Sequence, residues 1–203
     1  MVATQARKLK EKEALRRLIL DTAGELFTSE GYENVSMRKI GERIGYSPTT
    51  IYLYFRDKEE LLREVCESTF SRLADEIRRS YDGAVTPLER MRRGLLTYIR
   101  FGLANPHHYE VVFITSKVNF MSPNSYSFEG SMGQQAFELL ANSVRECATS
   151  GDIQVNDIAV TAQTLWAGIH GVTSLLIVHG GFPFVDRDVL ARSMVDTLIA
   201  GLK

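Results

Sequence analysis

Apolar residues recur at helical spacing along most of the chain, and this pattern constrains the fold more than any other feature. In the segment 12–29, one helix face collects Leu15, Leu18, Ile19, Leu26 and Phe27. Similar spacing predicts helices over 58–80, from 88 onward, over 156–180 and over 187–202. We find no convincing run of the strict apolar–polar alternation that marks strands. The sequence therefore predicts an all-α fold of about nine helices.

Prolines and small polar residues mark where these helices should begin. Ser47-Pro48, Thr86-Pro87 and Asn105-Pro106 each place a capping residue before a proline suited to the first turn. Thr86 and Glu89 have the spacing of a capping box, in which Glu89 accepts from the Thr86 amide. The same logic applies to Asp57 at the start of the helix over 58–80.

Composition excludes several classes of protein. The 203 residues are 44% apolar and 24% charged, which permits a sizeable core and excludes a disordered chain. The N-terminus is polar and basic, and the longest apolar stretch, 160–178, contains several polar residues. We therefore expect a soluble cytoplasmic protein. Cys66 and Cys147 lie far apart and are expected to be buried, reduced thiols.

The formal net charge of −1 argues at first against a nucleic-acid partner. The charge is unevenly distributed, however. Residues 1–56 hold 10 Lys and Arg against 7 Asp and Glu, whereas residues 100–203 hold 6 against 9. The front of the chain is therefore basic enough to approach a polyanion.

Residues 36–55 have the pattern of two short helices around a tight turn. Ser36 and Ser47 can cap the two helices, and Gly45 permits the turn. The apolar positions expected to face inward are Met37, Ile40, Ile44, Ile51 and Phe55. The exposed face of the second helix would present Thr49, Thr50 and Tyr54, with Tyr52 at its edge. This is the pattern of a helix-turn-helix, whose second helix enters the major groove of DNA.

The side chains suit that role. Small hydroxyl groups at the start of the second helix can contact base edges, while tyrosine hydroxyls and helix N-terminal amides bind phosphates. Lys58 follows closely and can add a cation. A short amphipathic helix pair inside an ordinary helical bundle has the same pattern, so the residues alone leave both interpretations open.

The stretch 19–58 resembles the DNA-binding domain of the TetR family of bacterial transcriptional regulators. The resemblance is carried by Ala23, Leu26-Phe27, Gly31-Tyr32, Ser36, Ile40-Gly41, Ile44-Gly45, Ser47, Ile51-Tyr52-Leu53-Tyr54-Phe55 and Asp57-Lys58. It implies an all-helical homodimer, usually a repressor that a ligand releases from a near-palindromic operator. Residues 1–56 would be the DNA-binding domain and 57–203 the ligand-binding and dimerisation domain, with no cofactor.

The resemblance also implies the DNA contacts. Arg38, Thr49 and Thr50 would contact bases or groove edges, whereas Ser36, Tyr52, Tyr54 and Lys58 would contact phosphates. Ser47 and Pro48 begin the recognition helix and complete the predicted set. Residues 1–11 form a basic arm; we expect a solvated, partly disordered tail rather than a DNA contact.

In the back half, residues 165–171 resemble the Trp…His-Gly signature of one TetR C-terminal subgroup. The helices over 156–180 and 187–202 would pack against their twofold mates through Gly168, Gly171, Leu175, Leu176, Val178, Leu198 and Ile199. The alternative is that these residues fill the core of one protomer.

Aromatic residues are frequent in the middle of the chain and predict a mostly apolar pocket for a medium-sized hydrophobic or aromatic effector. Its expected lining is Tyr98, Phe101, Tyr109, Phe113, Phe120, Tyr126, Phe137, Trp166 and His170, with Asn119 as a further polar group. Plain core packing is the alternative for any one of them. His107 and Glu110 share a helix face, but no second ligand cluster accompanies them, so no metal site is predicted.

Two other functions compete with the small-molecule-responsive regulator. The chain has no nucleophile elbow, P-loop or HExxH motif, which disfavours an enzyme. A DNA-binding regulator that responds to a protein partner, or to no ligand, is the second alternative.

Overall fold

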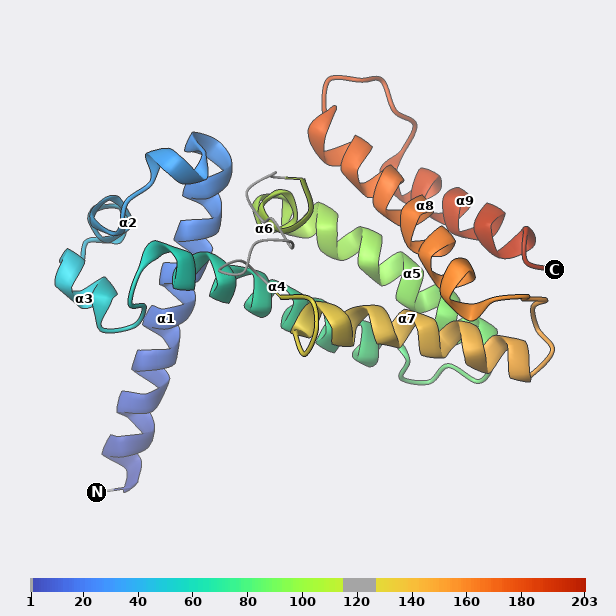
Figure 1. The fold of residues 1–203 in the computed structure, drawn as a ribbon, viewed down its shortest axis with the longest axis horizontal. Coiled ribbons are helices and arrows are strands. Elements are labelled where there is room, and N and C mark those ends of the chain that lie inside the picture. Colours follow the sequence, from blue (N-terminus) through green and yellow to red (C-terminus); the bar gives the residue numbers. More distant parts are fainter. Residues whose placement is uncertain (1, 115–126) are drawn as a thin grey trace. The chain divides into compact units, whose positions relative to one another are not determined.

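The computed structural model describes residues 2–114 and 127–203, and side chains from residue 5 onward. All regular structure within these ranges is helical (Figure 1), as predicted. The front half contains α1 (Val2–Glu30), the 3₁₀-helix η1 (Tyr32–Asn34), α2 (Met37–Ile44), α3 (Pro48–Tyr52) and α4 (Lys58–Ser80). There follow α5 (Pro87–Ala104), α6 (Pro106–Tyr109), the π-helix η2 (Glu110–Ile114), α7 (Met132–Thr149), α8 (Ile158–Val178) and α9 (Arg187–Ala200).

Three of the predicted helix caps are confirmed. The Asn105 side chain does not cap α6: its oxygen accepts from Arg72 and its amide donates to the Phe101 carbonyl. The hydroxyl oxygens of Ser36, Ser47 and Thr86 each accept a hydrogen bond from an amide three residues later. One detail differs, because the Glu89 carboxylate accepts from the Val85 amide at 3.1 Å rather than from the Thr86 amide. Local capping chemistry therefore fixes these helix boundaries.

The chain forms two compact units. The head comprises Met1–Thr69 and His107–Ser127, and the body comprises Phe70–Pro106 and Phe128–Lys203. The helix α4 contributes its first half to the head and its second half to the body. The predicted functional division between residues 56 and 57 stays a prediction.

The head is built around one apolar cluster. Helix α1 supplies Ile19, Ala23 and Phe27, which pack with buried residues of α2, α3 and the first turns of α4. Val111 of η2 joins the same cluster from far along the chain. The segment that returns to the head after α5 is therefore part of its core.

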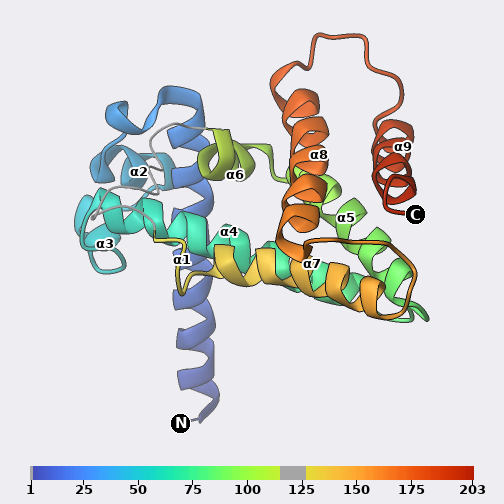
Figure 2. The same cartoon turned by 45° about the vertical axis from the view of Figure 1, so that its right-hand side comes forward.

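In the body, α5 is the central helix and contacts α7, α8 and α9 (Figure 2). Its buried residues are Met91, Gly94, Leu95, Tyr98, Ile99, Phe101 and Gly102. Cys147 lies in this unit and Cys66 in the head, and both thiols are free and buried, as predicted. Burial raises the pKa of Cys66 to about 12 and that of Cys147 to about 11.

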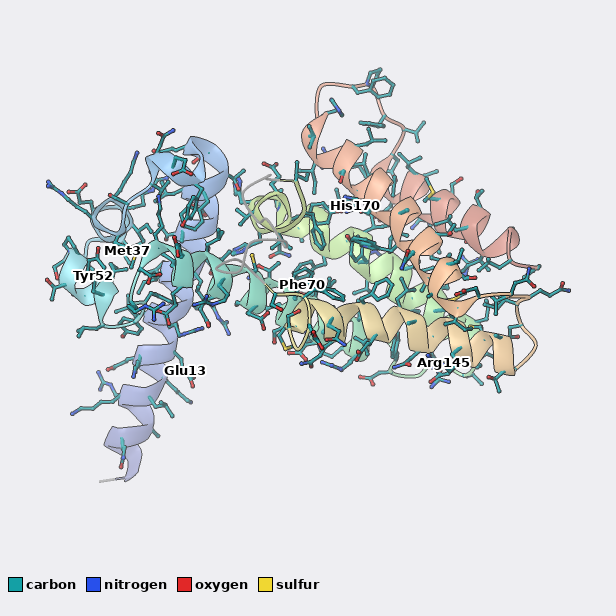
Figure 3. All side chains as sticks on the ribbon, viewed as in Figure 1. Glu13, Met37, Tyr52, Phe70, Arg145 and His170 are labelled. Atoms are coloured by element: carbon teal, nitrogen blue, oxygen red, sulfur yellow. The ribbon has the colours of Figure 1, made fainter. Side chains whose placement is uncertain are left out.

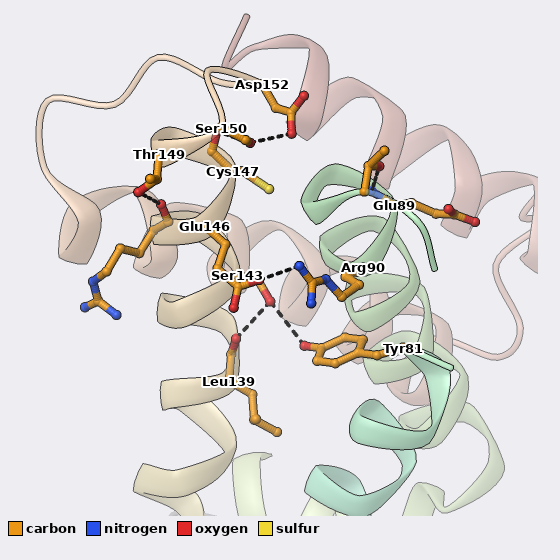
Figure 4. Close-up of polar contacts among 12 residues, drawn as sticks. Tyr81, Glu89, Arg90, Leu139, Ser143, Glu146, Cys147, Thr149, Ser150 and Asp152 are labelled. Atoms are coloured by element: carbon orange, nitrogen blue, oxygen red, sulfur yellow. Dashed lines mark hydrogen bonds and ion pairs between the residues drawn. The ribbon is translucent and has the colours of Figure 1, made fainter. Parts of the chain in front are cut away.

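Polar contacts fasten the end of α4 to the rest of the body (Figure 4). Tyr81 follows α4 directly, and its hydroxyl lies 3.2 Å from that of Ser143 on α7. Nearby, Arg90 of α5 pairs with Glu146 of α7 at 3.1 Å. The residue after the C-terminal end of α4 is thus bonded to α7, while the first turns of α4 belong to the head core.

Candidate DNA-binding and effector sites

The turn between α2 and α3 is compact. Gly45 ends α2 with a φ of 75°, which only a residue tolerant of the left-handed region adopts without cost. The Tyr46 amide then donates to the Gly41 carbonyl at 2.9 Å. A Cβ atom on Gly41 would lie 2.7 Å from the Tyr46 carbonyl oxygen, so the close approach of α2 to the turn requires glycine at position 41. The two helices are held in a fixed crossing.

Helix α3 buries Ile51 and exposes Thr49 and Tyr52. Tyr52 is labelled in Figure 3. Thr50 is half-buried, and its hydroxyl lies 2.9 Å from that of Ser47. One part of the predicted face is wrong: Tyr54 packs partly buried against the head core, whereas Tyr52 is 53% exposed. The reason is that Leu53 is still helical and the Phe55 amide donates to the Ile51 carbonyl, so Tyr54, three residues after Ile51, lies on the side that Ile51 buries.

Two predicted DNA-contacting cations already have partners inside the head. Arg38 forms an exposed ion pair with Glu42 at 2.7 Å, one helical turn away. Lys58 donates to the Tyr32 carbonyl at 2.8 Å, and its ammonium lies 4.2 Å from the centre of that tyrosine ring. A phosphate contact by Lys58 would have to replace this intramolecular bond or share it.

Sequence reasoning missed three exposed residues beside α3. Tyr46 and Leu53 are 43% and 77% exposed, and Arg56 is exposed with its guanidinium 2.8 Å from the Asp57 carboxylate. All three lie outside the helix interiors, where helical spacing carries no information about which way a side chain points. Their nearness to the turn and to the Asp57 cap is the signal that could have found them.

In the body, a chain of polar contacts joins α5 to α8. The Trp166 indole donates to the Tyr98 hydroxyl at 3.2 Å, and that hydroxyl lies 3.3 Å from His170 Nδ1. His170 Nε2 lies 3.3 Å from the Ser174 hydroxyl. Phe137 of α7 packs edge-on against Trp166, with ring centres 6.2 Å apart. We call Tyr98, Phe137, Trp166, His170 and Ser174 the effector cluster (His170 is labelled in Figure 3).

The structure brings together only part of the predicted pocket lining. Tyr98, Phe101, Phe137, Trp166 and His170 belong to the body, and Phe101 is fully buried. Tyr109 and Phe113 belong to the head, where their ring centres are 4.7 Å apart. The remaining predicted residues, Asn119, Phe120 and Tyr126, lie outside the described ranges.

Burial lowers the pKa of His170 below its usual value of about 6.5. The unfolded chain therefore takes up a proton near pH 6.5 that the folded body resists. The contribution of the neutral His170 to the free energy of unfolding is therefore fully present above about pH 6.5. It is lost as the pH falls through the pKa of His170 in the folded protein. We expect the free energy of unfolding, from urea titrations between pH 7 and 5, to fall less steeply in His170→Gln than in the wild type. His179→Gln, at an exposed histidine, is the control; equal slopes in all three proteins would contradict the assignment.

The predicted dimer residues divide into two groups. Leu175 and Val178 of α8 are 49% and 51% exposed, and a Cβ atom on Gly171 would meet nothing within 4 Å. Leu176 and Ile199, by contrast, are buried in the core of the protomer, which favours the alternative of core packing for these two residues. A Cβ on Gly168 would lie 2.7 Å from Leu198 Cδ1, so this glycine serves the close packing of α8 on α9 within one chain.

The segment 107–114 is fastened to the head by side chains that sequence reasoning did not select. His108 Nε2 lies 3.1 Å from the Asp21 carboxylate of α1, and Nδ1 lies 3.3 Å from the Thr69 hydroxyl of α4. The Thr28 hydroxyl donates to the His107 carbonyl at 3.0 Å. A Cβ on Gly24 would come within 3.2 Å of the His108 ring, so α1 makes room for it.

No helix in the described ranges is long and apolar enough to cross a bilayer. The family model of the bacterial regulatory proteins of the tetR family matches residues 19–65, and that of the tetracyclin repressor-like C-terminal domain matches residues 91–198.

Two relatives that match over nearly the whole chain are regulators by name. The HTH-type transcriptional regulator HbdR of Aromatoleum sp. (strain CIB) is 28% identical, over 98% of this chain and 82% of that protein. The fatty acid metabolism regulator protein of Bacillus subtilis (strain 168) is 21% identical, over 96% and 98%. The solved structure of the regulator FadR from Bacillus subtilis with stearoyl-CoA superposes with a TM-score of 0.75, at 18% identity, over 92% and 99%. The chain belongs to the TetR family of bacterial transcriptional regulators, DNA-binding dimers that respond to small molecules.

Proposed function

We propose that this protein is a cytoplasmic homodimeric repressor, without catalytic activity, that leaves a near-palindromic operator when a hydrophobic or aromatic effector binds the body. The observation that supports this most is the geometry of α2, the turn and α3. Helix α3 begins at the Ser47 cap and carries exposed hydroxyl side chains, and the close contact at Gly41 fixes its position against α2. Two such heads related by a twofold axis would read half-sites about one helical turn of DNA apart, roughly 34–36 Å, or somewhat more.

Within each head, Thr49 and Thr50 are assigned to base edges and Tyr52 to a phosphate. To contact DNA, Arg38 would have to give up its ion pair with Glu42. Binding would then favour DNA sequences whose contact with Arg38 offsets the lost ion-pair energy.

The effector cluster supports the proposed effector class. Its rings are apolar, while the Tyr98 hydroxyl and the neutral His170 imidazole offer one donor–acceptor chain for a single polar group. A fatty acyl group fits this description. Two relatives support this choice: one is named a fatty acid metabolism regulator protein, and the solved FadR structure contains stearoyl-CoA. Acyl-CoA thioesters are therefore the first compounds to test.

The segment 107–114 is the proposed connection between effector and DNA. It follows α5, which carries Tyr98, and it is bonded to α1 and α4 of the head through His108. It also contains the π-helix η2, a geometry that is frequent at functional sites. An effector that shifts the end of α5 would thus act on α1, and a coupling of about 1–3 kcal/mol would change operator occupancy roughly 5–150-fold.

The proposal is tested by selecting bound sequences from random duplex DNA and titrating the best site with effectors. We expect a near-palindromic consensus whose affinity falls steeply with salt. Stearoyl-CoA should release the complex, with stearate and free CoA as the comparisons that separate the acyl chain from the nucleotide. If no sequence is enriched, the DNA-binding proposal fails; if a site is found but none of these compounds weakens it, the effector assignment fails.

The role of Tyr52 can be tested separately with Tyr52→Phe. Because the phenol hydroxyl is assigned to a phosphate, its removal should weaken all sites by a similar factor of about 3–10, the value of one hydrogen bond. Affinities for the consensus and for single-base variants, measured by fluorescence anisotropy, check this. A changed order of preference among the variants would instead assign Tyr52 to a base.

A further inference from the structure

The first turns of α1 carry a concentrated positive charge outside the helix-turn-helix. Residues 5–17 hold six Lys and Arg against two Glu. The side chains of residues 5–14 are all exposed. Figures 1 and 2 both show this part of α1 extending beyond α2 and α3. Glu13, which lies in it, is labelled in Figure 3.

This part of the chain is a helix rather than the partly disordered tail expected from the sequence. A short polar helix is marginally stable when isolated, because nucleation is costly. Here the later turns of α1 are packed in the head core, so the first turns only have to propagate an existing helix. The consequence is that the lysines are presented in a fixed register.

Arg16 shows which way one face of this helix points. Its guanidinium carbon lies 5.4 Å from the centre of the Phe55 ring, just beyond the end of α3, and it also pairs with Glu64. Lys12 and Lys8 precede Arg16 by four and eight residues, and residues at this spacing share a helix face. We call Lys8 and Lys12 the lysine stripe; it continues, one and two turns toward the N-terminus of α1, the face from which Arg16 reaches Phe55, three residues past the end of α3.

The lysine stripe has no ion-pair partner among the described residues. Glu11, the nearest acid at helical spacing, is bound to Arg7 at 2.8 Å. We propose that the lysine stripe binds phosphates of duplex DNA that border the groove entered by α3. The inference rests on the proposed function, because α3 is what brings the duplex to this side of the head.

Duplex DNA fits this surface better than a membrane does. Residues 5–14 contain one large apolar side chain, Leu9, so the helix lacks the apolar face that an interfacial helix inserts into lipid. Its exposed length of about 15 Å, at about 1.5 Å per residue, suits a few consecutive phosphates. The charges of the stripe are one turn apart and point the same way, as contacts to a backbone require.

The test compares two double variants of the full-length protein with the same loss of charge. Lys8→Gln with Lys12→Gln removes the stripe, whereas Arg7→Gln with Lys10→Gln removes two cations from the other side of the same helix. Glutamine matches lysine in helix propensity, so circular dichroism should show α1 intact in both. Operator affinity is measured over a range of salt concentrations, and hydroxyl-radical footprints are recorded on the selected site.

For the stripe variant, four phosphate contacts are lost per dimer. The slope of log affinity against log salt should flatten by about 3–4, at about 0.9 per contact, and protection should disappear at the backbone positions bordering the α3 groove. The Arg7 and Lys10 variant should keep the slope and footprint of the wild type. Equal slopes in all three proteins, or equal changes in both variants, would overturn the proposal while leaving operator binding by α3 intact. Failure of the wild-type protein to bind any preferred sequence would instead overturn the proposed function.

Discussion

Introducing glutamate on the outer face of α8, by Leu175→Glu together with Val178→Glu, is expected to convert the dimer into a monomer and to abolish useful operator binding. Both side chains are about half exposed in the protomer, so the change should leave the body folded. In an isologous interface each substitution occurs twice, and four carboxylates would be desolvated without partners. A cost of several kcal/mol weakens dimerisation by at least about 100-fold.

Light scattering at micromolar concentration checks the first part, with a mass near 22.9 kDa expected for the variant and about twice that for the wild type. Operator affinity should fall by a similar factor of about 100 or more, because the small basic excess of one head gives little binding alone. Val85→Glu is the matched control, since Val85 is 89% exposed and lies in the α4–α5 turn. A stable dimer with unchanged affinity would remove α8 from the interface.

The elements that sequence reasoning predicted correctly depend on local chemistry. Ser36, Gly45 and Ser47 act on groups within a few residues of themselves, so their capping and turn roles could be read from the sequence. The helix over 58–80 was predicted at its observed bounds for the same reason. The limits of α3 were less predictable, because a five-residue helix leaves too few turns to show which face is buried.

Contacts between distant residues could not be predicted. Lys58 and Tyr32 are 26 residues apart, and His108 and Thr69 are 39 apart, and nothing in their local spacing indicates either pair. Helical spacing equally does not say whether an apolar residue faces its own core or a partner. Leu175 and Leu176 are neighbours on α8, yet one is exposed and the other buried. The resemblance to a family supplied the function that these patterns alone left open.

Gly41→Ala is expected to damage operator binding more than any other single-methyl change in the head. The new Cβ would lie 2.7 Å from the Tyr46 carbonyl oxygen and 3.4 Å from the Pro48 nitrogen. Both are backbone atoms, so relief requires α2 and the start of α3 to move apart rather than a side chain to rotate. Overpacking of this kind costs about 1–3 kcal/mol, and it displaces the recognition helix itself.

Gly45→Asn provides the matched control within the same turn. Gly45, unlike Gly41, has a positive φ; a Cβ there would meet nothing within 4 Å, and asparagine tolerates the left-handed region. Thermal unfolding should therefore separate the two variants, with a clear loss of stability for Gly41→Ala and little change for Gly45→Asn. Operator affinity should fall by about tenfold or more only in Gly41→Ala, because only there does the crossing of α2 and α3 change. If Gly41→Ala bound the operator as tightly as the wild type, a rigid contact between the two helices would not be what positions α3.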